Sequence, residues 1–152
     1  MTLPLAQMIF GEAPVTVAIA ANYVDSRDVA AAHLAAFENP AASGRYLLSG
    51  ERKRAIEMAS ELKALRPQTK PPTLEVPRSL LSVVCAADWL MNKTLKTPRL
   101  LSRDMLEDYV DDQVEYSSAR AAAELLWRPR PFAESLADTA DWILEKRPSA
   151  YT

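Results

Sequence analysis

The chain has 152 residues, of which 49% are hydrophobic and 25% charged, and its formal net charge is -2. This length and composition are those of one globular domain, so we treat residues 1–152 as a single domain and exclude disordered and repeat proteins. Lys and Arg are interspersed among Asp and Glu. The charge pattern therefore gives no electrostatic basis for binding nucleic acid.

The apolar segments are short and the chain contains a single cysteine. No uncharged run approaches the ~20 residues of a transmembrane helix, and the first ten residues lack the basic start of a signal peptide. The cysteine, Cys85, lies in an apolar run, which excludes an intrachain disulfide and a thiolate metal cluster. We expect a cytoplasmic protein with no membrane contact and a buried, unreactive Cys85.

The N-terminal part of the chain predicts a helical turn, a strand and a helix, in that order. Leu5–Phe10 is apolar and is followed by a glycine that suits a helix end. Val15–Val24 is uncharged and rich in β-branched and aromatic residues, which favours a strand. Asp25 suits the N-cap of a helix over Ser26–Phe37, whose apolar face we expect to include His33.

The next segments continue the alternation of strand and helix. Gly44–Gly50 (GRYLLSG) predicts a strand, Glu51–Leu65 a helix, and the TLEV of Thr73–Val76 a short strand. Alternating strands and helices favour parallel pairing, with the helices as crossovers. The predicted fold class is therefore α/β.

The remaining segments predict helices. Apolar Arg78–Leu90 is one candidate, Ser102 begins a second that runs to Tyr109, and Ser117 caps a third over Ala119–Leu126. Pro131 suits the first turn of a last helix. Its predicted buried stripe consists of Phe132, Leu136, Ala140 and Ile143.

Three segments of the chain form a recognisable set: YVDSRDVAAAHLAAFENP at Tyr23–Pro40, GRYLLSGE at Gly44–Glu51, and VEYSSARAAAELLWRPRPFAESLADTADWI at Val114–Ile143. Together they resemble the extended short-chain dehydrogenase/reductases, the NAD-dependent epimerase/dehydratase family. The pattern is closest to dihydroflavonol-reductase-like members and covers their C-terminal, substrate-binding part. The resemblance implies a helix-rich α/β fold with a few short parallel strands, without the Rossmann domain.

Complete enzymes of this family bind NAD(P) on a glycine-rich turn and use a tyrosine with a lysine four residues later. The only glycines here, Gly11, Gly44 and Gly50, do not have the fingerprint spacing. Residues Arg27, Gly50, Gln113 and Arg120 stand four positions after Tyr23, Tyr46, Tyr109 and Tyr116. We therefore assign no catalytic residue, no cofactor-binding residue and no cofactor to this chain.

Few side chains point to a ligand site. Because ligands gather at the carboxyl ends of strands in open α/β sheets, we expect Asn22 and Tyr23 to face a small-molecule substrate, with packing as an equal alternative. Asp25 and Asp28 suit capping and the helix dipole. The acidic run at 107–115 lacks the spacing of a calcium loop, so we assign no metal ligand.

The leading hypothesis is that the chain is a truncated, substrate-binding portion of an NAD(P)-dependent oxidoreductase or epimerase-like protein, inactive alone. The alternative is a stand-alone small-ligand-binding or protein-interaction module derived from such an enzyme. The uncharged strand Val15–Val24 presents an edge that another chain could pair with. We therefore expect a homodimer or a complex with a Rossmann-domain partner.

Overall fold

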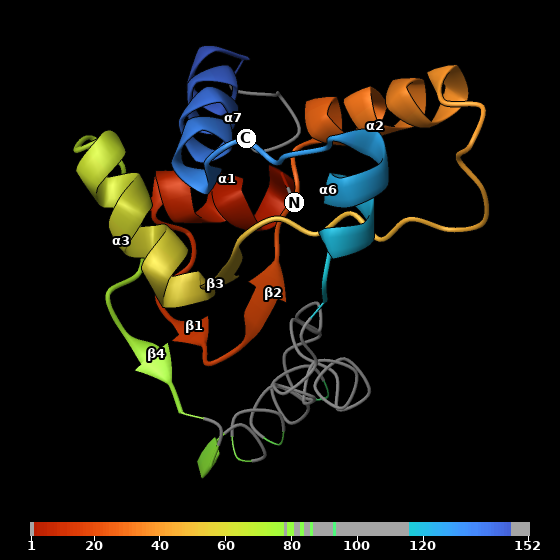
Figure 1. Ribbon diagram of the computed structural model, residues 1–152. Helices are drawn as coiled ribbons and strands as arrows, with labels where there is room; N and C mark the ends of the chain where they lie inside the picture. The colour runs from red at the N-terminus through yellow and green to blue at the C-terminus, as the bar shows by residue number, and fades with distance from the viewer. Residues whose placement is uncertain are drawn as a thin grey trace.

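The structure, a computed structural model, describes residues 2–77, 79–80, 83, 86, 93 and 116–146. Figure 1 shows helices packed beside small sheets. In chain order the elements are α1 (Thr2–Phe10), β1 (Thr16–Val17), β2 (Ala20–Asn22), α2 (Ser26–Glu38), β3 (Arg52–Arg54), α3 (Ala55–Leu65), β4 (Glu75–Val76), α6 (Ala119–Leu125) and α7 (Phe132–Lys146). The predicted helix Arg78–Leu90 lies largely outside the described residues. The helix Ser102–Tyr109, Cys85 and the acidic run at 107–115 lie wholly outside them.

The described strands form two separate pairs. β1 pairs with β4 in parallel, with Thr16 opposite Glu75, whereas β2 pairs with β3 in the antiparallel sense, with Ala20 opposite Arg54. The helix-rich α/β class is confirmed. The expected parallel pairing holds for β1 and β4 only, because residues 40–51 return along α2 before β3 begins (Figure 1). A bend at Ala18 divides the single predicted strand into β1 and β2.

The strand predicted over Gly44–Gly50 is wrong, because these residues form no ladder in the described part of the chain. Side chains from α6 and its N-cap satisfy the backbone there instead. The Ser118 hydroxyl accepts from the amide of Ser49 at 2.7 Å, and Arg120 donates to the carbonyls of Ser43 and Arg45. The strand lies further on, at β3, so α3 begins at Ala55 rather than at Glu51.

The larger core lies between α1, α3 and α7. Gly11, at φ +76°, ends α1 in the left-handed conformation that glycine adopts without strain. The predicted stripe of α7 is confirmed, and each of its members is at most 4% exposed. The buried core residues are Leu5, Ala6, Met8, Ile9, Met58, Leu62, Phe132, Leu136, Ala140 and Ile143. This core fixes α7 against the helices on either side of it.

A smaller core joins α2 to α6 and the segment that follows α6. It is built from Ala32, Ala121, Leu125 and Trp127. The predicted apolar face of α2 is partly wrong, because His33 is exposed and Phe37 is 89% exposed. The side chains that α2 buries are Asp28 and Ala32, which puts a charged residue on the inner face.

The caps of the helices follow the sequence closely. Asp25 is the N-cap of α2 and its carboxylate accepts from the amide of Arg27, as predicted. The Ser117 hydroxyl accepts from the amide of Ala119 at 3.3 Å, although the N-cap position of α6 is Ser118.

Among the described residues, no helix is both long and apolar enough to cross a bilayer.

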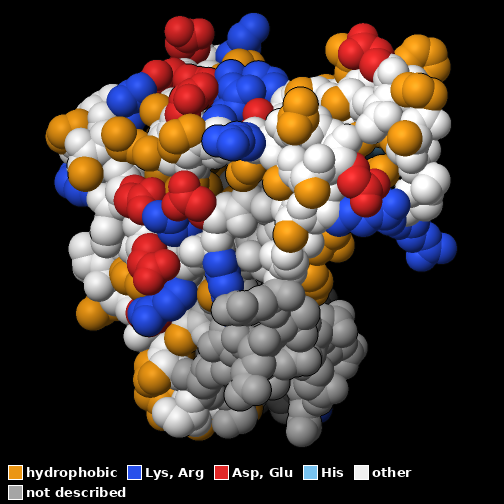
Figure 2. Space-filling view, in the orientation of Figure 1, with side chains coloured by type: hydrophobic (Ala, Val, Ile, Leu, Met, Phe, Trp, Pro, Cys, Tyr) orange, Lys and Arg blue, Asp and Glu red, His pale blue; other side chains and the backbone are white. Residues whose placement is uncertain are grey.

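On the face drawn in Figure 2, acidic and basic side chains lie among hydrophobic ones over α3 and α7, and further hydrophobic side chains lie near the C-terminal end of α2. Phe37 belongs to that end of α2. Exposed apolar side chains that lie close together are typical of a surface that contacts another molecule.

Candidate ligand-binding site

A cavity of about 350 Å³ opens where β2 ends, between the first turns of α7 and the residue before β3. Its size is within the range of small-molecule sites. The lining residues are Leu5, Tyr23, Val24, Asp25, Ser26, Glu51, Pro129, Arg130, Phe132, Ser135, Leu136 and Thr139. The predicted Tyr23 is among them, whereas the predicted Asn22 is not. Asn22 is instead paired with Arg52 in the β2–β3 ladder. Whether either residue contacts a substrate stays a prediction.

The aromatic part of the wall consists of Tyr23 and Phe132. Their ring centroids are 5.2 Å apart and the ring planes are inclined by 47°. The Lys53 ammonium lies 5.6 Å from the centre of the Phe132 ring, which is within cation–π range. A planar apolar ligand therefore has an aromatic surface to contact in the wall of the cavity.

A glycine fixes the backbone of Tyr23. A Cβ atom at Gly50 would lie 2.1 Å from the Tyr23 carbonyl oxygen, so no other residue fits there without a shift of the main chain. The Tyr23 amide also donates to the Glu51 carbonyl at 3.0 Å. The second glycine of GRYLLSG thus allows two backbone segments of the site to approach closely.

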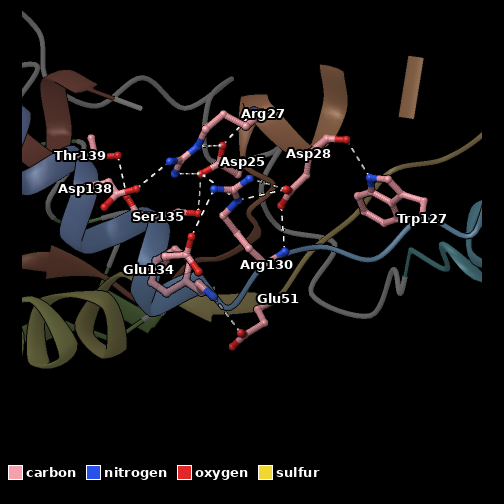
Figure 3. A network of polar contacts seen from close by, with 11 residues as sticks. Asp25, Arg27, Asp28, Glu51, Trp127, Arg130, Glu134, Ser135, Asp138 and Thr139 are labelled. Carbon is pink, nitrogen blue, oxygen red and sulfur yellow. Dashed lines mark hydrogen bonds and ion pairs between the residues drawn. The ribbon is translucent and has the colours of Figure 1, made fainter. Parts of the chain in front are cut away.

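Asp25 lies at the centre of a polar network beside the cavity (Figure 3). Its carboxylate accepts from the Arg27 guanidinium at 2.7 and 2.9 Å and from the Ser135 hydroxyl at 2.6 Å. The hydrogen bond from the Arg27 side chain holds the pKa of Asp25 well below its usual range and outweighs the effect of burial. Asp25 is therefore a fully bonded, ionised carboxylate.

Asp28 and Arg130 form the second half of the network. The Arg130 amide donates to Asp28 Oδ2 at 2.8 Å, and its Nε donates to Oδ1 at 3.0 Å. The Nε1–H of Trp127 donates to the Asp28 carbonyl, and Arg130 Nη1 lies 3.2 Å from Glu134 (Figure 3). The sequence predicted only a helix-dipole role for Asp28, because a partner 102 positions away leaves no local pattern.

Glu51 supplies the remaining charge of the wall. One of its oxygens accepts from the Phe132 amide at 3.0 Å, and the other lies 3.2 Å from the Lys53 ammonium. The bond from the backbone of Phe132, at the N-terminus of α7, is the main cause that lowers the pKa of Glu51. Glu51 is thus an ionised carboxylate, with 48% of its side chain exposed.

This arrangement is suited to ligand recognition. It combines an aromatic surface, ionised carboxylates and hydroxyl groups, which can orient a small molecule by hydrogen bonds. Among the described residues, no group of three or more His, Cys, Asp or Glu could hold a metal ion.

The glycines do not fit a dinucleotide site. Such a site places glycines between a strand and the N-terminus of a helix, where backbone amides meet the pyrophosphate. Gly11 follows α1, Gly44 lies in the turn after α2 at φ +72°, and Gly50 lies against the Tyr23 carbonyl. We therefore assign no step of a reaction to a nicotinamide cofactor held by these residues.

A second cavity, of about 520 Å³, lies between α3 and residues 70–73. Its wall includes Lys63, whose ammonium already donates to the carbonyls of Pro67 and Thr69. It has no aromatic side chain in its wall and no carboxylate. The first cavity is therefore the better candidate site, although it is smaller.

Comparison with known proteins is consistent with the sequence resemblance. The chain matches no protein-family model. It is 47% identical over 51 residues, 34% of its length, to cinnamoyl-CoA reductase 1 from Arabidopsis thaliana, and this match covers 15% of that protein. The similarity to extended short-chain dehydrogenase/reductases is thereby confirmed.

Solved structures share the fold over nearly the whole chain. The crystal structure of gox2253 matches 95% of this chain with a TM-score of 0.72 and 23% identity. PA4631, a nucleoside-diphosphate-sugar epimerase from Pseudomonas aeruginosa, matches 93% with a TM-score of 0.67 and 17% identity. The chain spans 43% and 41% of these two proteins, so it corresponds to less than half of each.

Proposed function

We propose that this chain is the substrate-binding portion of an NAD(P)-dependent oxidoreductase or epimerase-like protein and supplies no catalytic group of its own. The main supporting observation is the cavity beside Tyr23, Phe132 and Glu51, in a fold that matches part of gox2253 and part of the epimerase PA4631. Asn22 and Tyr23 remain our proposed substrate-facing positions. Of the two, Tyr23 has the stronger support because it lines the cavity.

The reaction would require groups from another polypeptide segment. In the resembling enzymes, NAD(P)H supplies the hydride for reduction and a tyrosine–lysine pair moves the proton. None of the tyrosines Tyr23, Tyr46 and Tyr116 has a lysine four positions later. What this chain contributes is the binding and orientation of the substrate, through a rigid wall built by the Asp25 and Asp28 networks.

The exposed apolar side chains support association with such a segment. Phe37 is 89% exposed, Leu126 85% and Leu34 57%. The structural relatives are more than twice as long as the part of them that this chain matches. We propose a Rossmann domain as the partner, with a homodimer as the alternative.

Cofactor titration tests whether the chain binds a nicotinamide cofactor or catalyses a reaction by itself. The protein is mixed with NADH or NADPH while nicotinamide fluorescence is followed, and nicotinamide oxidation is then measured with a set of aldehydes and ketones. We expect no saturable cofactor binding and no turnover. Saturable binding, or turnover that scales with protein concentration, would show that the chain carries its own catalytic site.

Light scattering on a sizing column tests the association. If the isolated chain forms the homodimer, Phe37→Ser should lower its apparent mass, whereas the neighbouring exposed substitution Glu38→Ser should leave the mass unchanged. A monodisperse monomer for the unmodified chain would contradict homodimer formation and leave the Rossmann domain as the only partner in the proposal.

A further inference from the structure

The geometry points to a cavity that selects neutral or cationic ring-bearing molecules with hydrogen-bond donors, such as alcohols and amines, and rejects carboxylates and phosphates. This inference rests on the proposed function, because it names the chemical class of ligand for the same cavity. Three features of the wall support it. They are its charge, the hydrogen bonds that its hydroxyl donors already make, and the position of a carboxylate with lone pairs still open to a ligand.

Carboxylates outnumber cations among the residues that line the cavity. The lining carboxylates are Asp25 and Glu51, and the lining cation is Arg130. A partly enclosed site of this sign attracts cations and repels anions. An anionic ligand would therefore enter against the local field.

The cations are already paired with carboxylates of the protein. Arg130 contacts Asp28 through two nitrogens and Glu134 through a third. Arg27 is bound to Asp25 and to Asp138, the latter at 2.7 Å. An incoming carboxylate would have to compete with these partners, of which the side chains of Asp25 and Asp28 are only 8% and 9% exposed.

Two hydroxyl donors of the wall, those of Ser135 and Thr139, are also in use. The Ser135 hydroxyl donates to Asp25, and the Thr139 hydroxyl donates to the Ser135 carbonyl at 2.7 Å. Each hydroxyl oxygen keeps lone pairs that can accept from a ligand. These two hydroxyls can therefore accept from a ligand, but can donate to it only by giving up a bond within the protein.

Glu51 is the charged acceptor that a ligand can reach. It is half-exposed, and an ionised carboxylate has about four lone-pair positions, of which the Phe132 amide and the Lys53 ammonium occupy two. The Tyr23–Phe132 surface lies in the same wall. A ring on the aromatic surface with an amino or hydroxyl group toward Glu51 would satisfy both features.

A matched series of three small probes tests the selection. Benzylamine, benzyl alcohol and benzoate share one ring and nearly one size, and their affinities are measured by two-dimensional amide NMR. We expect the affinity of benzylamine to be at least about tenfold higher than that of benzoate, with the affinity of benzyl alcohol between them. Benzoate binding as tightly as benzylamine would overturn the inference alone, whereas no binding of any probe would overturn the proposed function as well.

Variants distinguish binding in the cavity from a general electrostatic attraction of the probe to an acidic protein. Glu51→Gln keeps an acceptor for the Phe132 amide and removes the charge, so benzylamine affinity should fall to that of benzyl alcohol. Glu145→Gln removes the same charge from an exposed position of α7 and should change nothing. Equal effects of the two substitutions would overturn the inference. As a second check, Thr139→Met fills the cavity and should weaken all probes that bind there.

Discussion

The indole Nε1–H of Trp127 donates to the backbone carbonyl of Asp28 at 2.8 Å, across 99 positions of the chain. The carboxylate of the same aspartate is bound by Arg130, three residues after the tryptophan. One residue of α2 is therefore held through its main chain and its side chain by the segment between α6 and α7. This contact joins the smaller core to the wall of the cavity.

Loss of Arg130 should destabilise the fold. Arg130→Met leaves the 7%-exposed Asp28 without its cation, and we expect a loss of about 2–3 kcal/mol in the free energy of unfolding by urea. Arg128→Met is the matched control, because Arg128 is exposed in the same WRPRP segment. It should change stability by less than about 0.5 kcal/mol. Equal losses would contradict the role of the Asp28–Arg130 pair.

The second glycine of GRYLLSG should be less replaceable than the first. Gly50→Ala puts a methyl group 2.1 Å from the Tyr23 carbonyl oxygen and should cost about 3 kcal/mol or more, because the backbone must shift. Gly44→Ala requires a left-handed alanine at φ +72° with its nearest neighbour 3.5 Å away, so we expect about 1 kcal/mol. Thermal unfolding measures both. The opposite order would contradict the close approach at Tyr23.

Stability should fall in acid. The pKa values of Asp25 and Glu51 are lower in the folded protein than their ordinary values of 3.8 and 4.5. The unfolded chain therefore binds protons first, so the contribution is complete above about pH 5 and is lost as the pH falls through the folded values. Asp25→Asn should show a shallower loss of stability below about pH 4 in urea titrations. An unchanged slope would contradict the ionised state of Asp25.

The segment after α2 should open locally when its side-chain bonds are removed. The Tyr46 hydroxyl accepts from the Ser43 amide at 3.3 Å and donates to Glu124 at 2.6 Å. Tyr46→Phe should speed hydrogen exchange at the Ser43 amide, with a change in global stability below about 1.5 kcal/mol. The Ser49 amide, which is bound to Ser118, is the internal control and should keep its protection. Faster exchange at both amides would indicate a wider opening than the contacts predict.

Local patterns predicted several features of the helices. The Asp25 cap, the Gly11 end and the buried stripe of α7 depend on neighbouring residues, and all three are confirmed. That Gly44–Gly50 forms a loop rather than a strand could not be predicted, because the hydrogen bonds to its backbone come from Ser118 and Arg120, far along the chain.

The same reason limits prediction of the site. Tyr23 could be proposed from its place at the end of a strand, and it does line the cavity. Glu51, Ser135 and Arg130 could not, because the contacts that bring them together link α2, the start of β3 and α7 over 81 to 110 positions. Their residue types alone carry no signal of that geometry.

The central claim is that the cavity beside Tyr23 and Phe132 binds a small molecule without a cofactor. Amide NMR of the labelled protein during a benzylamine titration tests this most directly. We predict saturable shifts at Tyr23, Val24, Ser26, Ser135 and Thr139, which all line the cavity. Shifts that do not saturate, or that are concentrated in residues 56–73 around the second cavity, would contradict the claim.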